Sequence, residues 1–226
     1  NGTSLAVAMP GSVTAGSTLV LIARLGNDGV TISGASDNIN GNYTQQISRD
    51  QTIDGDRLLV YYFPNAASGT PTFTLTISAS ASINLGFIEA GLVATSSPVD
   101  QSNSADNTVA GTSFSSSSIT TLNANDYMIA AISSDGTGNG GADFTDSAGW
   151  TNRFAINAAV TPPGPSRLYI SDRIVSATVT YSDIFTSPVS ITSATAIIAL
   201  KQLDAITTAG NPIFRVNTSA WAQKWA

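Results

Sequence analysis

The acidic side chains of one short segment are the first that could do chemistry. Asp50, Asp54 and Asp56 lie within residues 50–56, and the segment resembles part of a calcium-binding loop because calcium prefers carboxylate oxygens. The segment lacks the alternating ligand positions and the final glutamate of an EF-hand. Because Asp54-Gly55 is also an ordinary hairpin dipeptide, we favour a turn here and keep calcium as the alternative.

A second acidic group lies around a glycine-rich stretch at residues 133–142. Asp135, Asn139, Asp143 and Asp146 could hold a cation from one exposed loop, since all four offer oxygen ligands. Acidic loops rich in glycine have this composition without any metal. We therefore favour a solvated loop and expect no cofactor, with calcium again as the alternative.

Aromatic side chains could bind a sugar ring by stacking. Tyr61 and Tyr62 are adjacent in an apolar segment, and adjacent residues of a strand face opposite sides of the sheet, so one ring could be exposed to a glycan. Tyr43 and Trp150 could also stack a sugar. They occupy matching places in an internal repeat, however, so we expect them to fill the core.

Two residue types that carry much of enzyme chemistry are missing. The chain contains no histidine and no cysteine, which excludes Ser-His-Asp triads, thiol nucleophiles and zinc–thiolate sites. Glu89 is the only glutamate, and nothing in the sequence marks a pair of acids across a cleft, as glycoside hydrolysis requires. We expect no enzymatic activity, and a hydrolase using aspartate pairs is the third hypothesis.

The composition limits the classes of partner that we expect this chain to bind. Of the 226 residues 11% are charged, and the net charge is −6. Nucleic-acid binding needs clustered lysine and arginine, so we expect no nucleic acid. No apolar run reaches the length that spans a bilayer, so we expect no membrane insertion. The absence of cysteine fits the outside of a cell or virion. The first residue is Asn1 rather than methionine, which leaves open whether it is a processed terminus.

The elements that must position these residues are strands. Helix-favouring glutamate and lysine are scarce, while threonine, valine, isoleucine and serine are abundant, and this predicts an all-β chain. The nearly continuous apolar run at residues 19–25 predicts a central strand that is buried on both faces.

The sequence contains an internal repeat. Residues 14–22 reappear in altered form at residues 123–131. Asp37 precedes Tyr43-Thr44 in the first half, as Asp146 precedes Trp150-Thr151 in the second. We expect Asp37 and Asp146 to form turns by accepting backbone hydrogen bonds. Arg57 and Arg167 open equivalent strands, and pairing with these two aspartates is a further structural use that we expect of them. Such a repeat predicts a two-halved β architecture.

The segment between the halves, residues 95–121, is rich in serine, threonine and asparagine. We interpret it as a crossing with a short strand at residues 109–114, and a flexible linker is the rival. The crossing is preferred because neither half, at about 80 residues, is expected to close a sandwich by itself.

The predicted fold is thus a jelly-roll-like antiparallel β-sandwich. It is built from two pseudo-repeated halves, about 14–94 and 122–201, in a single domain at residues 1–201. Residues 202–226 form a C-terminal extension that we interpret as a docking tail. Its residues expected to make assembly contacts are Ile213, Phe214, Val216, Trp221 and Trp225. The tail would dock on a neighbouring subunit by adding a strand and inserting both tryptophans.

The order of these motifs resembles a two-halved β-sandwich module of bacterial secreted proteins and of tailed-phage virion proteins of the tail, fibre and capsid surface. The resemblance covers residues 14–201. Its carriers are residues 15–20, 37–44, 60–66 and 81–90, answered in the second half by residues 146–151 and 167–171. The resemblance implies no catalytic residues, since the module has none to carry over.

Together these observations predict a non-enzymatic structural protein of a virion surface or cell exterior, such as a capsid decoration, tail or appendage subunit. Its partners would be other subunits of the same assembly, and we expect a homo-oligomer. The alternative is a carbohydrate-binding or adhesive module of a secreted or tail-fibre protein, which would bind surface glycans through Tyr61, Tyr62 and the loop at residues 133–142.

Overall fold

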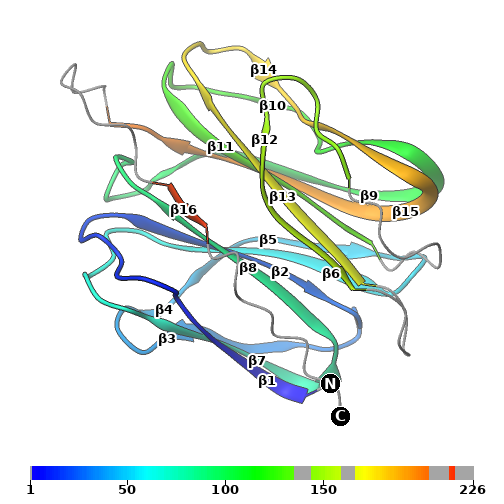
Figure 1. The fold of residues 1–226 in the computed structure, drawn as a ribbon, viewed down its shortest axis with the longest axis horizontal. Helices are drawn as coiled ribbons and strands as arrows, with labels where there is room; N and C mark the ends of the chain where they lie inside the picture. Colours follow the sequence, from blue (N-terminus) through cyan, green and yellow to red (C-terminus); the bar gives the residue numbers. More distant parts are fainter. Residues whose placement is uncertain (1, 135–143, 159–165, 204–213, 217–226) are drawn as a thin grey trace.

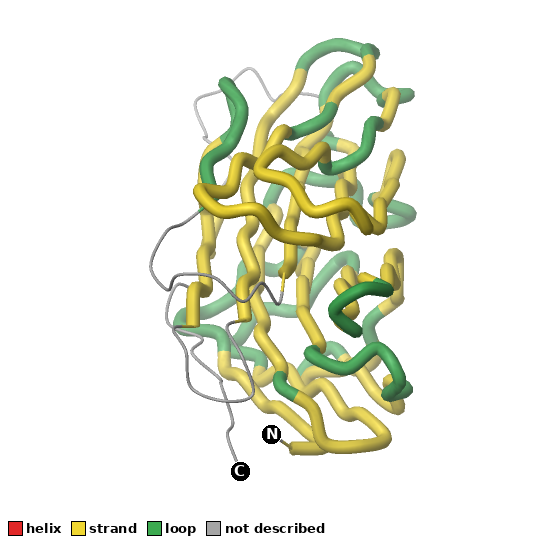
Figure 2. The backbone as a smooth tube through the Cα atoms, turned by 90° about the vertical axis from the view of Figure 1, so that its right-hand side faces the viewer, coloured by secondary structure: helices red, strands yellow, loops and turns green. Residues whose placement is uncertain are grey.

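The chain is built from strands and turns. The computed structural model describes residues 2–134, 144–158, 166–203 and 214–216, and Figure 2 draws strands and loops along that part of the chain. These described ranges contain no helix, and so none that is long and apolar enough to cross a membrane. The prediction of an all-β chain is confirmed.

The described strands form four sheets, and every printed pairing in them is antiparallel. The first outer sheet consists, in spatial order, of β1 (Gly2–Ala8), β7 (Thr72–Ala81), β3 (Ile32–Asp37) and β4 (Gly41–Asn42). The first inner sheet consists of β16 (Phe214–Val216), β8 (Ile83–Ala90), β2 (Thr18–Leu25), β6 (Asp56–Phe63) and β5 (Thr44–Gln51). The second inner sheet consists of β12 (Thr151–Ala158), β13 (Ser166–Val175), β11 (Asp126–Ser134), β15 (Ile184–Lys201) and β9 (Val99–Ser115). The outer pair consists of β10 (Ile119–Thr120) and β14 (Thr180–Tyr181).

The sheets are stacked face to face. Figure 1 shows the first outer sheet at the bottom, the first inner sheet above it, and then the second inner sheet with β10 and β14 at the top. Three clusters of buried apolar side chains lie between or against these layers. The expected packing of antiparallel sheets is therefore present.

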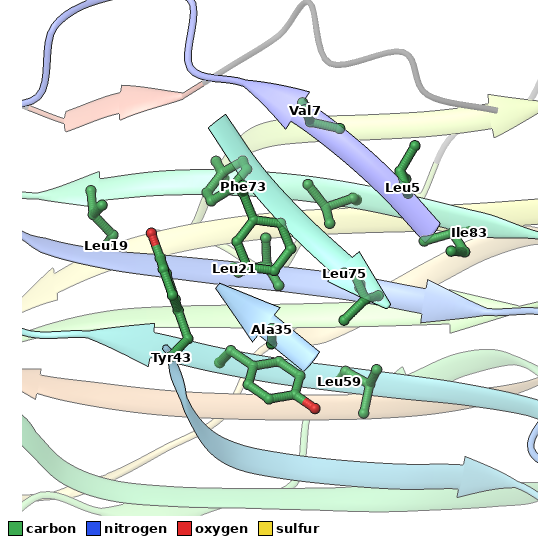
Figure 3. Close-up of a cluster of buried hydrophobic side chains, with 14 of the residues drawn as sticks. Leu5, Val7, Leu19, Leu21, Ala35, Tyr43, Leu59, Phe73, Leu75 and Ile83 are labelled. Carbon is green, nitrogen blue, oxygen red and sulfur yellow. The ribbon is translucent and has the colours of Figure 1, made fainter. Parts of the chain in front are cut away.

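The first core lies between the first outer and first inner sheets. In β7 the side chains of Phe73, Leu75 and Ile77 are buried in it, while the threonines between them are more exposed, because successive residues of a strand face opposite sides. Phe73 meets Tyr43 edge to face, with ring centroids 5.2 Å apart, and Figure 3 shows leucines gathered around both rings. The first half thus encloses a core of its own, contrary to the expectation that neither half does so.

Strand β2 connects two of the cores. All eight of its residues are buried, and the predicted central strand is confirmed. Leu19 and Leu21 lie in the first core, whereas Val20 and Ile22 lie in the central core, between the two inner sheets. Burying a side chain of this size contributes roughly 1.5–3 kcal/mol, so β2 stabilises both contacts.

The third core lies on the outer face of the second inner sheet. Trp150, Tyr169 and Phe185 are buried in it, and the rings of Tyr169 and Phe185 meet edge to face at 6.0 Å. Segment 144–150 and the pair β10–β14 also contribute buried residues to this core. It is the counterpart of the first core in the other half.

The two inner sheets have the same strand order. The first reads β16-β8-β2-β6-β5 and the second β9-β15-β11-β13-β12, so each strand of one sheet has a counterpart in the other. Leu25 of β2 pairs with Arg57, and Ser134 of β11 pairs with Arg167, which places the two arginines at equivalent positions.

The strands at the opposite edges of the two inner sheets, β5 and β12, also pair with their neighbours in corresponding registers. Thr44 of β5 pairs with Tyr62, and Thr151 of β12 pairs with Asp172. Each of these edge strands then has one irregularity in register at the same place, around Gln46 in β5 and around Arg153 in β12.

The segment between the halves is an ordered strand. β9 spans 17 residues and pairs with β15 along most of its length. The crossing was therefore the correct alternative to a flexible linker, although the strand is much longer than the predicted 109–114.

Three pairings of the first half are nested along the chain: β5 with β6, β3 with β7, and β2 with β8. β1 and β16 lie at edges outside this nest.

Candidate functional site

The edge of the first inner sheet at β8 is covered by a short strand of the C-terminal tail. β8 pairs with β2 on one side and with β16 on the other, as Figure 1 shows for the red arrow beside β8. The register pairs are Phe214–Ala90, Arg215–Glu89 and Val216–Ile88. A segment of the tail thus completes the sheet as a fifth strand.

β9 takes the corresponding place in the second inner sheet. It covers the outer side of β15, as β16 covers that of β8. Val99 of β9 lies opposite Leu200 near the end of β15, and Phe214 lies opposite Ala90 at the end of β8. The last strand of each half is therefore covered by the strand that follows the other half along the chain.

The segment after β8 leads to β9, the segment after β15 leads towards β16, and these two connecting segments contact each other. Val93, after β8, forms a bridge with Gln202, after β15. The N–H of Ala94 donates to the carbonyl of Lys201, and the N–H of Leu203 donates to the carbonyl of Leu92, both at 2.9 Å. The crossing segments are thereby held together by backbone hydrogen bonds.

A strand edge of this kind binds by main-chain hydrogen bonds and accepts many sequences. Of the residues predicted to make assembly contacts, Phe214 and Val216 lie in β16, and the strand they form pairs within the same chain. Ile213, Trp221 and Trp225 lie outside the described residues. Docking on a neighbouring subunit stays a prediction.

A pair of carboxyl groups lies beneath the third core. Asp183 is fully buried and accepts hydrogen bonds from the backbone N–H of Ser147 and from the hydroxyls of Ser147 and Ser171. Asp146 accepts a hydrogen bond of 2.6 Å from the hydroxyl of Tyr169. Burial raises the pKa of Asp146 to about 6, the hydrogen bond from Tyr169 opposes this shift, and the neighbouring charge of Asp183 adds to it.

A second pair of carboxyl groups lies near the crossing segments. Asp126 begins β11, its side chain is fully buried, and neither of its carboxylate oxygens accepts a hydrogen bond from a described residue. Asp100 of β9 lies within hydrogen-bonding reach of it. Burial raises the pKa of Asp126 to about 7, Asp100 adds to this shift, and Lys201 opposes it.

The sequence-predicted calcium residues at 50–56 have other partners. Asp56 is buried and forms a two-pronged ion pair with Arg24, at 2.6 and 2.8 Å. Asp50 pairs with Arg57, and Asp54 accepts a hydrogen bond from Thr192. The three carboxylates therefore do not form one site, and the described part of the chain contains no group of three acidic side chains able to hold a metal. Asp135 and Asp143 lie outside the described residues.

The proposed sugar-stacking residues are largely covered. Tyr61 is 4% exposed and faces the first core, where its hydroxyl donates to Gln45 at 2.6 Å, so the prediction of a stacking platform at Tyr61 is wrong. Tyr62 faces the central core and is half-buried there. Tyr43 and Trp150 are both buried in core clusters, and their prediction as core residues is confirmed.

The expected pairing of Asp37 with Arg57 is absent. Arg57 contacts Asp50 and the carbonyls of Asp28 and Val30. Asp37 instead caps the turn after β3.

In that turn Asp37 accepts hydrogen bonds from the backbone N–H groups of Ile39 and Asn40, and from the hydroxyl of Tyr43. Burial alone would raise the pKa of Asp37, but these hydrogen bonds hold it below its usual value. The alternative use as a turn-former, also drawn from the sequence, is correct for Asp37.

Sequence reasoning missed Asp100, Asp126 and Asp183. Each is an isolated acid in its own segment. Asp100 and Asp126 come together through the strand order that brings β9, β15 and β11 side by side, and Asp183 meets Asp146 where Thr145 bridges to Thr186. One signal was available for Asp126: it stands at the start of an apolar segment that repeats residues 14–22, whose apolar run was predicted to be buried.

Compared with known proteins, the chain matches no family model, no curated protein and no solved structure.

Proposed function

We propose that this chain is a non-enzymatic structural protein of a virion surface or cell exterior, and that its copies join through the tail strand β16. The observation that carries the proposal is the slot beside β8, which a separate segment of chain fills as the fifth strand. A slot of this kind provides affinity through backbone hydrogen bonds, so no specific pocket or cofactor is needed.

Exchange of this strand would link copies without new contacts. β16 fills the slot of its own chain, and residues 204–213 connect it to the end of the second half. A neighbouring copy offers an identical slot, so a tail that crosses to the neighbour makes the same pairs there, as in domain swapping. If the exchange is reciprocal it gives a dimer, and if it runs head to tail it gives a ring or a fibre.

The correspondence between the two halves supports the proposal that the strand beside β8 can be exchanged between copies. The two inner sheets share strand order and register, and the edge of each last strand is covered by the strand that follows the other half along the chain. We include in the proposal that the halves are copies of one unit, for which exchange of the outermost strand is the normal way to complete the sheet.

Composition is in keeping with an exterior role. With 11% charged residues and no cysteine, the chain depends on serine, threonine and asparagine for solubility and has no thiol to oxidise.

The proposal is tested by removing β16 in two ways. Deleting residues 211–226, or replacing Arg215→Pro, should leave a folded monomer, because proline disfavours strand pairing at this position. Arg215→Ala is the matched control: it changes the side chain and keeps the backbone donor, so it should assemble as the unchanged protein does. Light scattering after size exclusion, with electron microscopy, measures the state, and circular dichroism checks the fold.

Assembly of the truncated chain to the same size as the full chain would exclude β16 as the joint. A full chain that stays monomeric at high concentration would exclude the proposal altogether. The carbohydrate-binding alternative is not proposed as a second function, because burial of Tyr61 removes the aromatic platform on which it relied.

A further inference from the structure

Asp126 has a buried carboxyl group to which no described residue donates a hydrogen bond. Its side chain is 0% exposed, and neither oxygen accepts a hydrogen bond from a described residue. Two other fully buried acids do have partners: Asp183 accepts three hydrogen bonds, and Asp56 pairs with Arg24. Leaving an ionised group buried without a partner is costly, so the charge of Asp126 must be neutralised by a proton or balanced by a cation.

The nearest charged groups do not supply that partner. Asp100 lies within hydrogen-bonding reach and carries the same sign of charge. Its own oxygens accept from the backbone N–H of Leu122 and the side-chain amide of Asn123, each at 2.7 Å, which fixes its position. Two carboxylates held together in this way require a proton or a cation between them.

Lys201 is close but is directed elsewhere. It lies opposite Asp126 in the register of β15 and β11, and its charge acts on Asp126. Its ammonium group donates to the carbonyl of Ser97 at 3.0 Å rather than to either carboxylate. The positive charge therefore offsets part of the repulsion without satisfying the oxygens of Asp126.

Asp100 and Asp126 offer carboxylate oxygens, and the chain supplies no imidazole or thiolate of the kind that zinc or copper prefers, since it has no histidine or cysteine. Carboxylate and carbonyl oxygens are the ligands of hard divalent cations, and calcium accepts them in irregular numbers and geometry. Two carboxylates, completed by carbonyl groups and water, suit calcium better than the strict octahedron of magnesium.

We propose that Asp100 and Asp126 bind a calcium ion at the end of the second inner sheet, next to the crossing segments. This site differs from the calcium site considered at residues 50–56. The aspartates there are already bound by two arginines and a threonine of the same chain. The proposal does not depend on assembly through β16.

The test is a calcium titration of the full chain after treatment with EDTA and dialysis. Isothermal calorimetry should show saturable binding of one ion, with a dissociation constant of about 0.1–1 mM, the range of extracellular calcium modules. Calcium should also raise the midpoint of thermal unfolding by several degrees, because it binds only the folded chain. Magnesium should have a much smaller effect.

Asp126→Asn should weaken calcium binding at least tenfold, while Asp54→Asn, the matched control in the other acidic segment, should leave it unchanged. In EDTA, Asp126→Asn should unfold at a higher temperature than the unchanged protein, because the like charge beside Asp100 is gone. Lys201→Met should tighten calcium binding by removing a competing positive charge.

The proposal is overturned if the unchanged protein takes up no calcium at ten times the expected dissociation constant, or if Asp126→Asn binds as tightly as before. If Asp126→Asn does not fold, the result with Lys201→Met decides, and an affinity no tighter than that of the unchanged chain overturns the proposal.

Discussion

Gly86 of β8 lies directly against Ile170 of β13, across the interface between the two inner sheets. A Cβ atom at residue 86 would come within 2.6 Å of the Ile170 Cδ1 and within 3.1 Å of the Phe154 ring. The close approach of the sheets at this point therefore depends on the missing side chain.

Replacing this glycine should destabilise the stack of sheets. We expect Gly86→Ala to lower the free energy of unfolding by about 1–3 kcal/mol, and Gly86→Val to lower it more, because overpacking forces neighbouring side chains from their preferred positions. Chemical denaturation monitored by tryptophan fluorescence measures the change. Gly34→Ala is the control, since a Cβ there would meet only Thr76 at an ordinary 3.8 Å. Equal effects at the two positions would contradict the close packing described here.

The buried ion pair of Arg24 with Asp56 gives a second prediction. Both side chains are almost fully buried, and their two-pronged contact leaves each charge dependent on the other. Asp56→Asn or Arg24→Met alone should cost about 3–5 kcal/mol, because an uncompensated charge stays buried. The double variant Arg24→Met with Asp56→Leu should cost less than the sum. A double-mutant cycle by denaturant unfolding measures this coupling, and strictly additive effects would mean that the pair contributes nothing.

Asp146 gives a pH dependence whose sign follows from its raised pKa. The pKa is about 6 in the folded chain, against about 3.9 in an unfolded one. The folded state therefore binds the proton more tightly, and the stability that this proton provides is complete below pH 4 and is lost as the pH rises through 6.

Asp146→Asn should remove that part of the dependence, because the amide can donate to Asp183 at every pH and still accept from Tyr169. We expect the unchanged protein to lose on the order of 1–3 kcal/mol between pH 4 and pH 7 relative to this variant. Thermal unfolding at a series of pH values measures the difference, with Asp54→Asn as the control. Parallel curves for the unchanged protein and Asp146→Asn would show that Asp146 does not hold this proton.

Local patterns allowed part of this fold to be predicted. The apolar run of β2, the core roles of Tyr43 and Trp150, and the turn at Asp37 all followed from residue type and spacing, and the structure confirms them. Each depends on neighbours within a strand or turn, where alternation and capping leave a direct mark on the sequence.

Features that depend on which strands become neighbours were not predictable. One of Tyr61 and Tyr62 was expected at the surface because adjacent strand residues face opposite ways, but sheets cover both faces of β6, so both directions lead into a core. The pairing of Asp100 with Asp126 requires β9, β15 and β11 to lie in that order. Nothing within either segment indicates the other.

The measurement that tests the central claim most directly is a disulfide across the β8–β16 pair. Phe214 and Ala90 face each other in an antiparallel pair, a spacing that a disulfide can bridge, and the chain has no other cysteine. The variant Ala90→Cys with Phe214→Cys is oxidised in its assembled form and separated by gel electrophoresis without reductant. The single variants and the pair Val99→Cys with Leu200→Cys, which joins β9 to β15, are the controls.

If copies join through exchanged tails, the Ala90–Phe214 pair should give chains linked to one another by disulfides, as covalent dimers after reciprocal exchange and as longer ladders after head-to-tail exchange. Each single variant should give none, and the Val99–Leu200 pair should stay within single chains. An assembled fraction in which every Ala90–Phe214 disulfide lies within one chain would contradict the claim.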